Sequence, residues 1–536
     1  MSSVVVAPTV SSRPAINGWF VAAAVIIPTF MEVLDTTVAI VSLRYIAGDL
    51  SAAVVDAEWV LTCYLAANAT ILPISGWLSA RLGRRNYFLA SIAVFTIASA
   101  LCGMATSLWQ IIVFRIIQGL AGGGLQPSSQ AVLIDSFPPE KQGMAMTMFG
   151  IAALTAPVVG PTLGGYLSDY HSWRWIFYIN IPIGCVAFLL TYFLVEDPDY
   201  LKQERAQLLR RPLNFDYIGL ALLALVMSAW EVLISKGQEW DWLGDPFGKV
   251  QTLLLIFLIG GICLVVWEMR RDNPVVNFRP LGERNFWVCC IIIFCAYAVL
   301  YAVSTSLPGL LQSLFGYDAY HSGLVMSPSG LASVSMLLIC GALLGRGVDG
   351  RWLIGGGMLV VAAGSYWMSV MTLEISPWQA IWPRVLLIAG LGMAFAPLNV
   401  AAFLYMPRHL RAAAVGLFAL LRNEGGSFGT SMARTVQVRR DQFHTWRVGE
   451  FLDPFNSTVS SYLAQAQAFF FQKTGDAPRA QRMALQRLSD LRGQQSLSMA
   501  YFDVFFVSAI LAVLLAFLVL LMKRSVAEKG AHVGAE

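Results

Sequence analysis

The chain has 536 residues, of which 57% are hydrophobic and only 13% are charged, and its formal net charge is +4 at pH 7. Soluble domains carry about 25% charged residues, so this composition excludes an ordinary soluble protein and indicates a polytopic membrane protein. The small positive charge does not indicate a nucleic-acid partner, because basic residues in a membrane protein mainly set its orientation.

Apolar runs of about 20 residues recur along almost the whole chain. Each run is long enough to cross a hydrocarbon core of about 30 Å as an α-helix, and is too uniformly apolar for a barrel strand. The first run is too long for the core of a secretory signal peptide, so we expect it to be retained as a span. We place fourteen spans, at residues 19–42, 57–79, 87–106, 108–131, 145–168, 174–195, 215–234, 250–269, 286–314, 322–344, 352–372, 381–405, 411–435 and 500–522.

Basic residues in the connecting segments predict the orientation. If the N-terminus is cytoplasmic, the inside loops carry many basic residues and the outside loops carry few, as the positive-inside rule requires. The inside residues are Arg81, Arg84, Arg85, Lys141, Lys202, Arg205, Arg210, Arg211, Arg270, Arg271, Arg279, Arg284, Arg346, Arg351, Arg408, Arg411, Lys523 and Arg524, and the outside residues are Arg44, Arg174, Lys236 and Lys249. One missed span would invert every later loop, so the pattern supports an even number of spans with both termini in the cytoplasm.

Two acidic residues, Glu32 and Asp35, lie inside the first expected span. Residues three apart share one face of a helix. An ionised carboxylate near the centre of a bilayer costs about 3 kcal/mol on insertion scales, so a pair of acids there is expected to serve as a proton or substrate site.

Arg115 lies inside the fourth expected span and stays charged, so it needs an acid or a carbonyl partner within the helix bundle. Asp35 and Arg115 each lie about seven residues, or about 10 Å, from the outer ends of their spans. We therefore expect them to pair. The alternative is that Arg115 snorkels to the outer interface.

Further charged residues lie within the expected spans, some near the middle of a span and some near its ends. Arg422 is near the middle of the thirteenth span and is expected to join an ion pair, whereas Glu424, two residues further on, points elsewhere. Asp503 lies in the outer third of the last span, where water access makes it a candidate for proton coupling. The remaining charges are near span ends and are expected to snorkel; they are Glu231, Arg384 and Arg434.

The segment from 437 to 499 is expected to be a long outer loop with two helical segments, at about 457–471 and 479–491. One interpretation is a lid packed on the outer mouth of the helix bundle. The other is a docking surface for a periplasmic partner.

The chemistry of an enzyme is not evident in the sequence. The eight cysteines fall in or beside apolar runs, without disulfide or zinc-ligand spacing, and the five histidines form no metal-like cluster. There is no Gly-x4-Gly-Lys-Ser/Thr phosphate loop and no nucleophile–base arrangement. We therefore expect no enzyme, no cofactor and no metal.

Three motifs resemble those of the major facilitator superfamily. The loop Gly76-Trp77-Leu78-Ser79-Ala80-Arg81-Leu82-Gly83-Arg84-Arg85 resembles motif A, with Ala80 where the superfamily usually has aspartate. Motif B is matched by Arg115, Gln118, Gly119 and Gly122-Gly123-Gly124, and the antiporter motif C by Gly150, Pro157, Gly160, Pro161, Gly164 and Gly165. Glycines allow close helix approach and prolines kink helices. The alternatives are a plain basic loop for the first motif and an ordinary kinked span for the third.

Further landmarks over residues 17–522 resemble the fourteen-span drug:proton antiporters of the EmrB/QacA type, and the long outer loop is similar to that of the EmrB branch. The landmarks are Phe30-Met31-Glu32-Val33-Leu34-Asp35-Thr36-Thr37, Trp173-x-Trp175-Ile176-Phe177-x-Ile179-Asn180-x-Pro182-x-Gly184, Gly237-x-Glu239-Trp240-Asp241-Trp242, Trp267-Glu268-x4-Asn273-Pro274 and Arg422-x2-Gly425-x-Ser427-x-Gly429-Thr430-Ser431. Glu32 and Glu424 stand where the family is expected to have neutral residues.

The resemblance implies an all-α major facilitator fold of fourteen transmembrane helices arranged as six, two and six. Its parts would be a cytoplasmic tail at 1–16, a six-helix bundle at 17–195, an inserted helix pair with loops at 196–285, a second six-helix bundle at 286–522 that includes the outer loop 437–499, and a cytoplasmic tail at 523–536.

The resemblance also implies a proton-coupled multidrug efflux transporter of the inner membrane, which exports amphipathic toxic compounds by alternating access, confers antibiotic resistance and works with a periplasmic adaptor and an outer-membrane channel. Proton coupling would involve Asp35 and Glu32 with Arg115, and Arg422 and Asp503 are further candidates. The alternatives are a dedicated exporter of one metabolite or siderophore-like compound, and a non-transporting sensor or assembly protein.

Overall fold

The computed structural model describes residues 18–137, 139–210, 216–271, 274–407, 410–453 and 455–525. The expected N-terminal tail, residues 526–536 of the expected C-terminal tail, Arg211, Asn273 and Arg408 lie outside the described residues, as do the side chains of Lys141 and Arg210.

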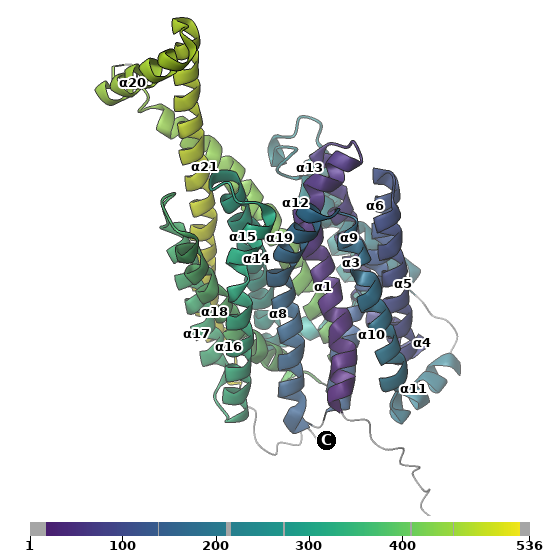
Figure 1. The fold of residues 1–536 in the computed structure, drawn as a ribbon. Helices are drawn as coiled ribbons and strands as arrows, with labels where there is room; N and C mark the ends of the chain where they lie inside the picture. The colour runs from purple at the N-terminus through teal and green to yellow at the C-terminus, as the bar shows by residue number, and fades with distance from the viewer. Residues whose placement is uncertain are drawn as a thin grey trace, which may run out of the picture.

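All regular elements in these described ranges are helical (Figure 1). In chain order they are α1 (Gly18–Asp49), α2 (Val54–Ala57), α3 (Trp59–Ile71), α4 (Ser75–Leu82), α5 (Arg84–Met104), α6 (Leu108–Gly122), α7 (Leu125–Ser136), α8 (Pro139–Tyr170), α9 (Trp175–Tyr178), α10 (Asn180–Leu194), α11 (Asp199–Arg210), α12 (Tyr217–Lys236), α13 (Lys249–Met269), α14 (Arg284–Leu314), α15 (Ala319–Met326), α16 (Pro328–Gly345), α17 (Gly350–Ser369), α18 (Pro377–Phe403), α19 (Arg411–Gly449), α20 (Ser457–Thr474) and α21 (Ala477–Leu518).

The prediction of an all-α, multi-span membrane protein is confirmed. Within the described ranges, twelve helices or continuous helix pairs are long and apolar enough to cross a bilayer, and α3 with α4, bent by 59°, makes a thirteenth. The remaining expected span, the thirteenth at residues 411–435, lies in α19, which packs against α14 and α21. Its composition is more polar because Arg422 and Glu424 lie in the expected span and charged residues fill its last third.

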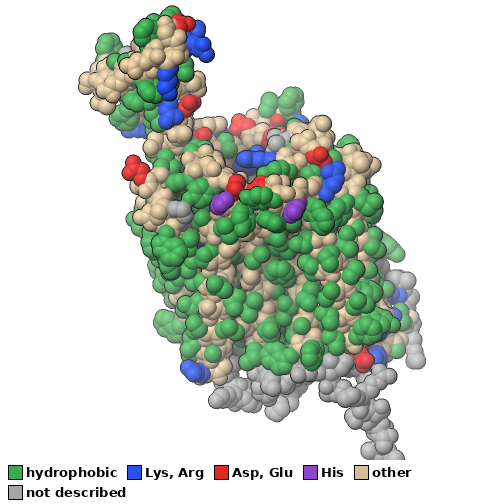
Figure 2. Space-filling view, in the orientation of Figure 1, with side chains coloured by type: hydrophobic (Ala, Val, Ile, Leu, Met, Phe, Trp, Pro, Cys, Tyr) green, Lys and Arg blue, Asp and Glu red, His purple; other side chains and the backbone are tan. Residues whose placement is uncertain are grey.

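The surface of the body agrees with a membrane setting. Hydrophobic side chains cover its waist, and charged side chains gather toward its two ends (Figure 2). Bilayer lipid offers no hydrogen bonds, so polar groups within this belt must be satisfied inside the bundle.

The two halves of the chain repeat one pattern of helix contacts, and they lie on opposite sides of the body in Figure 1. In the first half α1 packs on α8, α3 on α6 and α5 on α10; in the second, α14 packs on α19, α16 on α18 and α17 on α21. Because of this repeat, α6 corresponds to α18, and α1 corresponds to α14. The inserted helices α12 and α13 pack on each other, and α12 also contacts α3 and α19.

The segment at 437–499 differs from the expected loop. Helix α20 confirms the first expected helical segment, but the second is the beginning of α21, which continues without a break into the last span. The hydropathy pattern marks where the chain becomes apolar, and a helix can extend beyond that point into water. Figure 1 shows α20 and the adjoining end of α21 projecting beyond the bundle as an arm, so the lid interpretation is wrong.

Close contact between α14 and α19 requires glycine. A Cβ atom added at Gly429 would lie 2.1 Å from the carbonyl oxygen of Ala298, which is backbone and cannot rotate away. We expect Gly429→Ala to destabilise the protein by about 1–3 kcal/mol, the usual range for overpacking. Thermal unfolding of the purified protein in detergent measures this effect.

The matched control is Gly261→Ala in α13, where an added Cβ meets nothing within 4 Å. This variant is expected to unfold at or slightly above the wild-type temperature, since alanine is the better helix former. Equal losses of stability in the two variants would contradict the close-contact argument.

Candidate functional site

The centre of the body contains two polar clusters that meet on α1. Glu32 and Asp35 are each only 3% exposed, although they are carboxylates in the middle of an apolar helix. They lie on neighbouring parts of one face, as expected, but their partners differ.

Asp35 is held by three side chains from two other spans. Arg115 Nη1 lies 2.5 Å from Asp35 Oδ2, and Gln118 Nε2 donates to Oδ1 over 3.0 Å. Asn180 Nδ2 donates to the same Oδ1 over 2.7 Å. The expected Asp35–Arg115 pair is present in the structure, and Asn180, which belongs to the landmark that begins at Trp173, is a further partner that the sequence did not predict.

Arg115 is fully buried, so the snorkelling alternative is wrong. Its guanidinium carbon lies 4.9 Å from the ring centres of both Tyr64 and Phe177. Aromatic faces attract a cation, and here they take the place of water. The sequence carried no separate signal for these two rings, because they come from spans whose rotation about their axes is set by packing.

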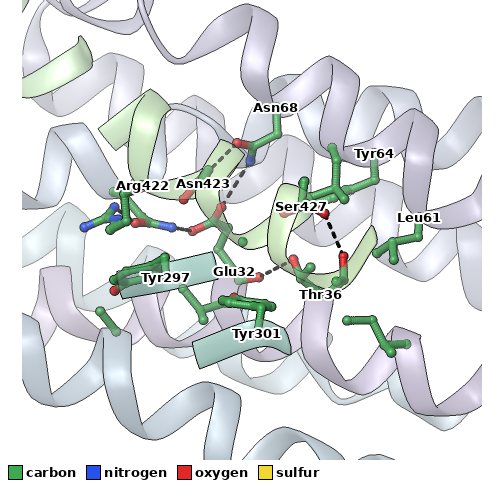
Figure 3. A pocket seen from close by; sticks show the side chains of 17 residues that line it. Glu32, Thr36, Leu61, Tyr64, Asn68, Tyr297, Tyr301, Arg422, Asn423 and Ser427 are labelled. Atoms are coloured by element: carbon green, nitrogen blue, oxygen red, sulfur yellow. Dashed lines mark hydrogen bonds between the residues drawn. The ribbon is translucent and has the colours of Figure 1, made fainter. Parts of the chain in front are cut away.

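Glu32 belongs to a chain of hydrogen bonds that joins the two halves of the protein (Figure 3). Asn68 Nδ2 donates to its Oε1 over 3.1 Å, and Gln126 Nε2 donates to its Oε2. Arg422 of α19 donates in turn to Gln126 Oε1, and Asn423 donates to Asn68 Oδ1 over 3.2 Å. Arg422 thus reaches Glu32 through Gln126, a link that the sequence did not indicate.

A cavity of about 50 Å³ lies beside Glu32, between the two halves. Its wall includes Glu32, Tyr64, Tyr297, Tyr301, Arg422 and Ser427 (Figure 3). This volume suits a few water molecules but not a drug-sized compound. A substrate of that size requires the two halves to move apart.

Arg384 is the counterpart of Arg115 in the second half and does not snorkel as expected. It is fully buried on α18, and its Nη2 donates to Ser304 Oγ on α14 over 2.6 Å. The other two guanidinium nitrogens have no hydrogen-bond partner among the described residues. Ser304 thus occupies, in this pair, the place that Asp35 has beside Arg115.

Glu231 was also expected to snorkel and is instead buried, at 2% exposure, against α19. Glu424 lies beside it and points away from Arg422, as expected. Arg434 agrees with its expected place at a span end, since it is half exposed and bonds to Glu58.

Asp503 lies apart from Glu32 and Asp35. It is bound by Arg440, at 2.5 Å, and by His444, at 2.7 Å, and its side chain is 27% exposed. These partners come from the last third of α19, beyond the expected span. The structure therefore does not bring Asp503 together with the other proton-coupling candidates.

The motif A loop holds helix ends through its arginines. Arg84 Nη1 donates to the carbonyl of Ala131 near the end of α7, and Arg85 Nη2 donates to that of Tyr192 near the end of α10. Asp135 bonds to Arg84, and Asp197 accepts the backbone N–H of Arg85 over 2.9 Å. The plain-loop alternative is wrong, and these aspartates, which the sequence analysis missed, supply the carboxylates that Ala80 lacks.

Other residues of this loop contribute differently. Gly83 has φ +89°, in the left-handed region that favours glycine, and joins α4 to α5. The carbonyl of Arg81 accepts from Arg205 Nε over 3.1 Å, which ties the loop to α11. Nothing lies within 4 Å of a Cβ added at Gly76, so close packing does not explain that glycine.

The corresponding loop of the second half has its own carboxylate, Asp349, before α17. Partial burial pushes the pKa of Asp349 upward, but hydrogen bonds from Arg351 and from the Ser525 backbone outweigh it and hold the pKa below its ordinary value. Its Oδ2 accepts from Arg351 Nη2 over 2.8 Å.

The motif B and motif C glycines lie at helix crossings. A Cβ added at Gly119 would be 2.4 Å from the Tyr64 carbonyl oxygen, and one at Gly160 would be 2.0 Å from Thr37 Oγ1. Gly164 packs on Val38 of α1, and Gly165 packs on Ala319, which belongs to the other half. Pro157 and Pro161 lie within α8, and this helix contacts helices of both halves.

Comparisons with known proteins agree with this architecture. Residues 25–430 match the family model described as Major Facilitator Superfamily. "Multidrug export protein EmrB" of Haemophilus influenzae is 36% identical over 84% of this chain and 86% of that protein. "Fatty acid resistance protein FarB" of Neisseria gonorrhoeae is 35% identical over 80% of this chain and 83% of that one.

Two solved structures share the fold at low sequence identity. A bacterial homologue of the human lysosomal transporter Spinster, inward-facing and occupied, has a TM-score of 0.55 at 15% identity, covering 95% of this chain and 97% of that one. The proton:xylose symporter XylE has a TM-score of 0.56 at 13% identity, covering 94% of each chain. The chain belongs to the Major Facilitator Superfamily of membrane transporters, and within it to the EmrB type.

Proposed function

We propose that the protein exports amphipathic toxic compounds across the inner membrane in exchange for protons. The observation that carries this proposal is the buried Asp35, held by Arg115, Gln118 and Asn180. Glu32, on the same helix, lines a water-sized cavity between the two halves. The names of two relatives, a multidrug export protein and a fatty acid resistance protein, support export as the direction of transport.

Protonation of Asp35 would remove the charge that holds Arg115. The Asp35 carboxyl would then retain hydrogen bonds from its neutral neighbours, while Arg115 would depend on Gln118 and the two aromatic rings. Glu32 is the second carboxylate of this proposal, because its link to Arg422 crosses between the halves and must break or rearrange when they separate. A proton bound at α1 thereby changes which conformation is favoured.

The energy available from protons is sufficient. One charge crossing 100 mV yields about 2.3 kcal/mol. This energy supports a concentration ratio of nearly two powers of ten across the membrane for a neutral compound. We further propose that both termini are cytoplasmic, that the arm of α20 and α21 lies in the periplasm, and that residues 17–195 and 286–522 are the two moving bundles, joined by the inserted pair at 196–285.

The proposal is tested with ethidium in everted membrane vesicles that contain the full chain. We expect ethidium to accumulate under a proton-motive force and the gradient to collapse when an uncoupler is added. No accumulation above vesicles without the protein would contradict transport. Movement of one metabolite only, among a panel of unrelated compounds, would instead support the dedicated exporter.

The arm is proposed to dock a periplasmic adaptor protein, which connects the transporter to an outer-membrane channel. Exposed apolar side chains are Phe469 and Phe471 on α20, at 52% and 47% exposure, and Phe455 just before this helix, at 94%. Large apolar side chains that face water in this way commonly mark interaction surfaces.

Replacing Phe455, Phe469 and Phe471 together by serine tests the docking surface. We expect loss of adaptor binding in a pull-down with the co-expressed adaptor, together with unchanged ethidium accumulation in everted vesicles, since the arm projects away from the central cavity. Gln465→Ser, an exposed change on the same helix, is the control. Adaptor capture equal to wild type by the triple variant would refute this site.

A further inference from the structure

A second pair of buried acids lies outside the site described above. Glu231 of the inserted helix α12 is 2% exposed, and Glu424 of α19 is 5% exposed. Their carboxyl groups are close enough to share a hydrogen bond. The pair thus bridges the inserted helices and the second half of the protein.

The surroundings of this pair are mainly apolar and aromatic. The Trp230 side chain lies close to Glu424, and its ring stacks on Phe257 and Phe428 with centroid distances of 4.9 and 6.2 Å. Glu424 Oε2 is buried and accepts no hydrogen bond from any donor of the described residues. An ionised carboxylate in such a place lacks the donors that would stabilise its charge.

No cation of the described helices packed on α12 faces the pair. Lys236 on α12 itself is bound to Glu58 and Glu239. The charged residues of α13, Lys249 and Glu268, lie at its ends, and α3 carries no charged residue between Trp59 and Ile71. The titratable side chains of α3 are Cys63 and Tyr64.

The helices packed on α19 likewise bring charges that are engaged elsewhere. On α19 itself, Arg422 bonds to Gln126 and Arg434 to Glu58. The titratable groups of its other neighbours include Arg284, Cys295, Tyr297 and Tyr301 of α14, Arg81 of α4, Asp135 of α7, and Arg492, Tyr501 and Asp503 of α21. Asp135 and Asp503 are bound to arginines, and none of these groups contacts either glutamate.

Two carboxylates cannot both be ionised at hydrogen-bonding distance in a dry environment without a cation. A single proton between them satisfies both groups, because a protonated carboxyl donates to an ionised one. We propose that Glu231 and Glu424 bind a proton between them and so form a proton site separate from Asp35, built where the inserted helix α12 meets α19.

Ser427 connects this site to the central cavity. It lines the cavity wall beside Glu32 (Figure 3), and its side chain also lies close to Glu231. A hydroxyl both donates and accepts hydrogen bonds, so Ser427 is placed to pass a proton between cavity water and the pair. The inserted helix pair would thus supply one of the two carboxyl groups of a proton site, in addition to its packing. The existence of this proton site does not depend on the proposed export function.

Infrared spectroscopy of the purified full chain in detergent tests the proposal without any transported compound. At neutral pH we expect the carbonyl-stretch band of protonated carboxyls to be smaller in E231Q/E424Q than in wild type by at least one carboxyl. The same band component should remain in Asp35→Asn and in Glu32→Gln. A band of equal area in wild type and E231Q/E424Q would show that both groups are ionised and would overturn the proposal.

Thermal unfolding provides a second test, and E424Q alone serves if the double variant does not fold. An amide at position 424 still donates to Glu231, so this variant needs no proton between the two groups. We expect the melting temperature of the wild type to fall relative to E424Q as the pH is raised above neutral, because losing the proton leaves two like charges in contact. A pH-independent difference would overturn the proposal, whatever the fate of ethidium transport.

Discussion

We expect Asp35→Asn to abolish the proposed proton-driven export of ethidium while leaving the protein folded. Asparagine keeps the size of the side chain and one acceptor for Arg115, but it cannot exchange a proton. One proton crossing 100 mV can sustain an ethidium concentration gradient of nearly two powers of ten, and the variant loses this gradient. Ethidium accumulation in everted vesicles measures this loss, and counterflow of ethidium without a proton gradient should remain.

Asp49→Asn is the control for that substitution. Asp49 ends the same helix α1, is 48% exposed in its side chain and bonds to Arg174. Its replacement is expected to leave accumulation at the wild-type level, since a solvated ion pair contributes little. Proton-driven accumulation that survives in Asp35→Asn would show that the coupling proton is bound elsewhere.

Arg115→Leu is expected to destabilise the protein by about 3–5 kcal/mol. Removing one partner of a buried ion pair leaves the other charge without compensation, and Asp35 would keep only the neutral donors Gln118 and Asn180. The stacking of the guanidinium on Tyr64 and Phe177 is lost as well. Equilibrium unfolding of the purified protein in mixed micelles measures the change.

Arg174→Leu is the matched arginine substitution, since that side chain is 30% exposed and pairs with Asp49 at the bundle end. Its expected cost is at most about 1 kcal/mol. Combining Asp35→Asn with Arg115→Leu should cost less than the sum of the single changes, because both act on one pair. Additive costs would mean that the contact contributes no coupling energy.

The membrane spans and the Asp35–Arg115 contact followed from sequence because each rests on one local rule. A bilayer satisfies no backbone hydrogen bonds, so apolar runs of about 20 residues must be helices. The charge of the connecting loops predicts their orientation. Asp35 and Arg115 lie at matching depths, and an arginine that cannot lose its proton needs an acid there. The motif glycines indicated close helix crossings for the same reason, since only glycine has no Cβ.

Local sequence rules did not predict the burial of charged side chains near span ends. Arg384 and Glu231 were expected to snorkel because they lie close to outer ends, yet both are buried at 2% exposure or less. Depth along a helix says nothing about which side of the helix faces lipid. The partners of these residues, Ser304 and Glu424, come from distant parts of the chain, so no local pattern marks them.

The amino-acid sequence by itself determined the all-helical membrane architecture, the family resemblance and the two acids on the first span, because these depend on the apolarity, length and spacing of single segments. Only the tertiary structure decided that Arg422 reaches Glu32 through Gln126, that Asp135 and Asp197 replace the acid missing at Ala80, and that α21 continues into an arm. Each of these depends on the rotation and packing of helices that are distant in sequence, and the hydrogen-bonding needs of buried polar groups select those arrangements.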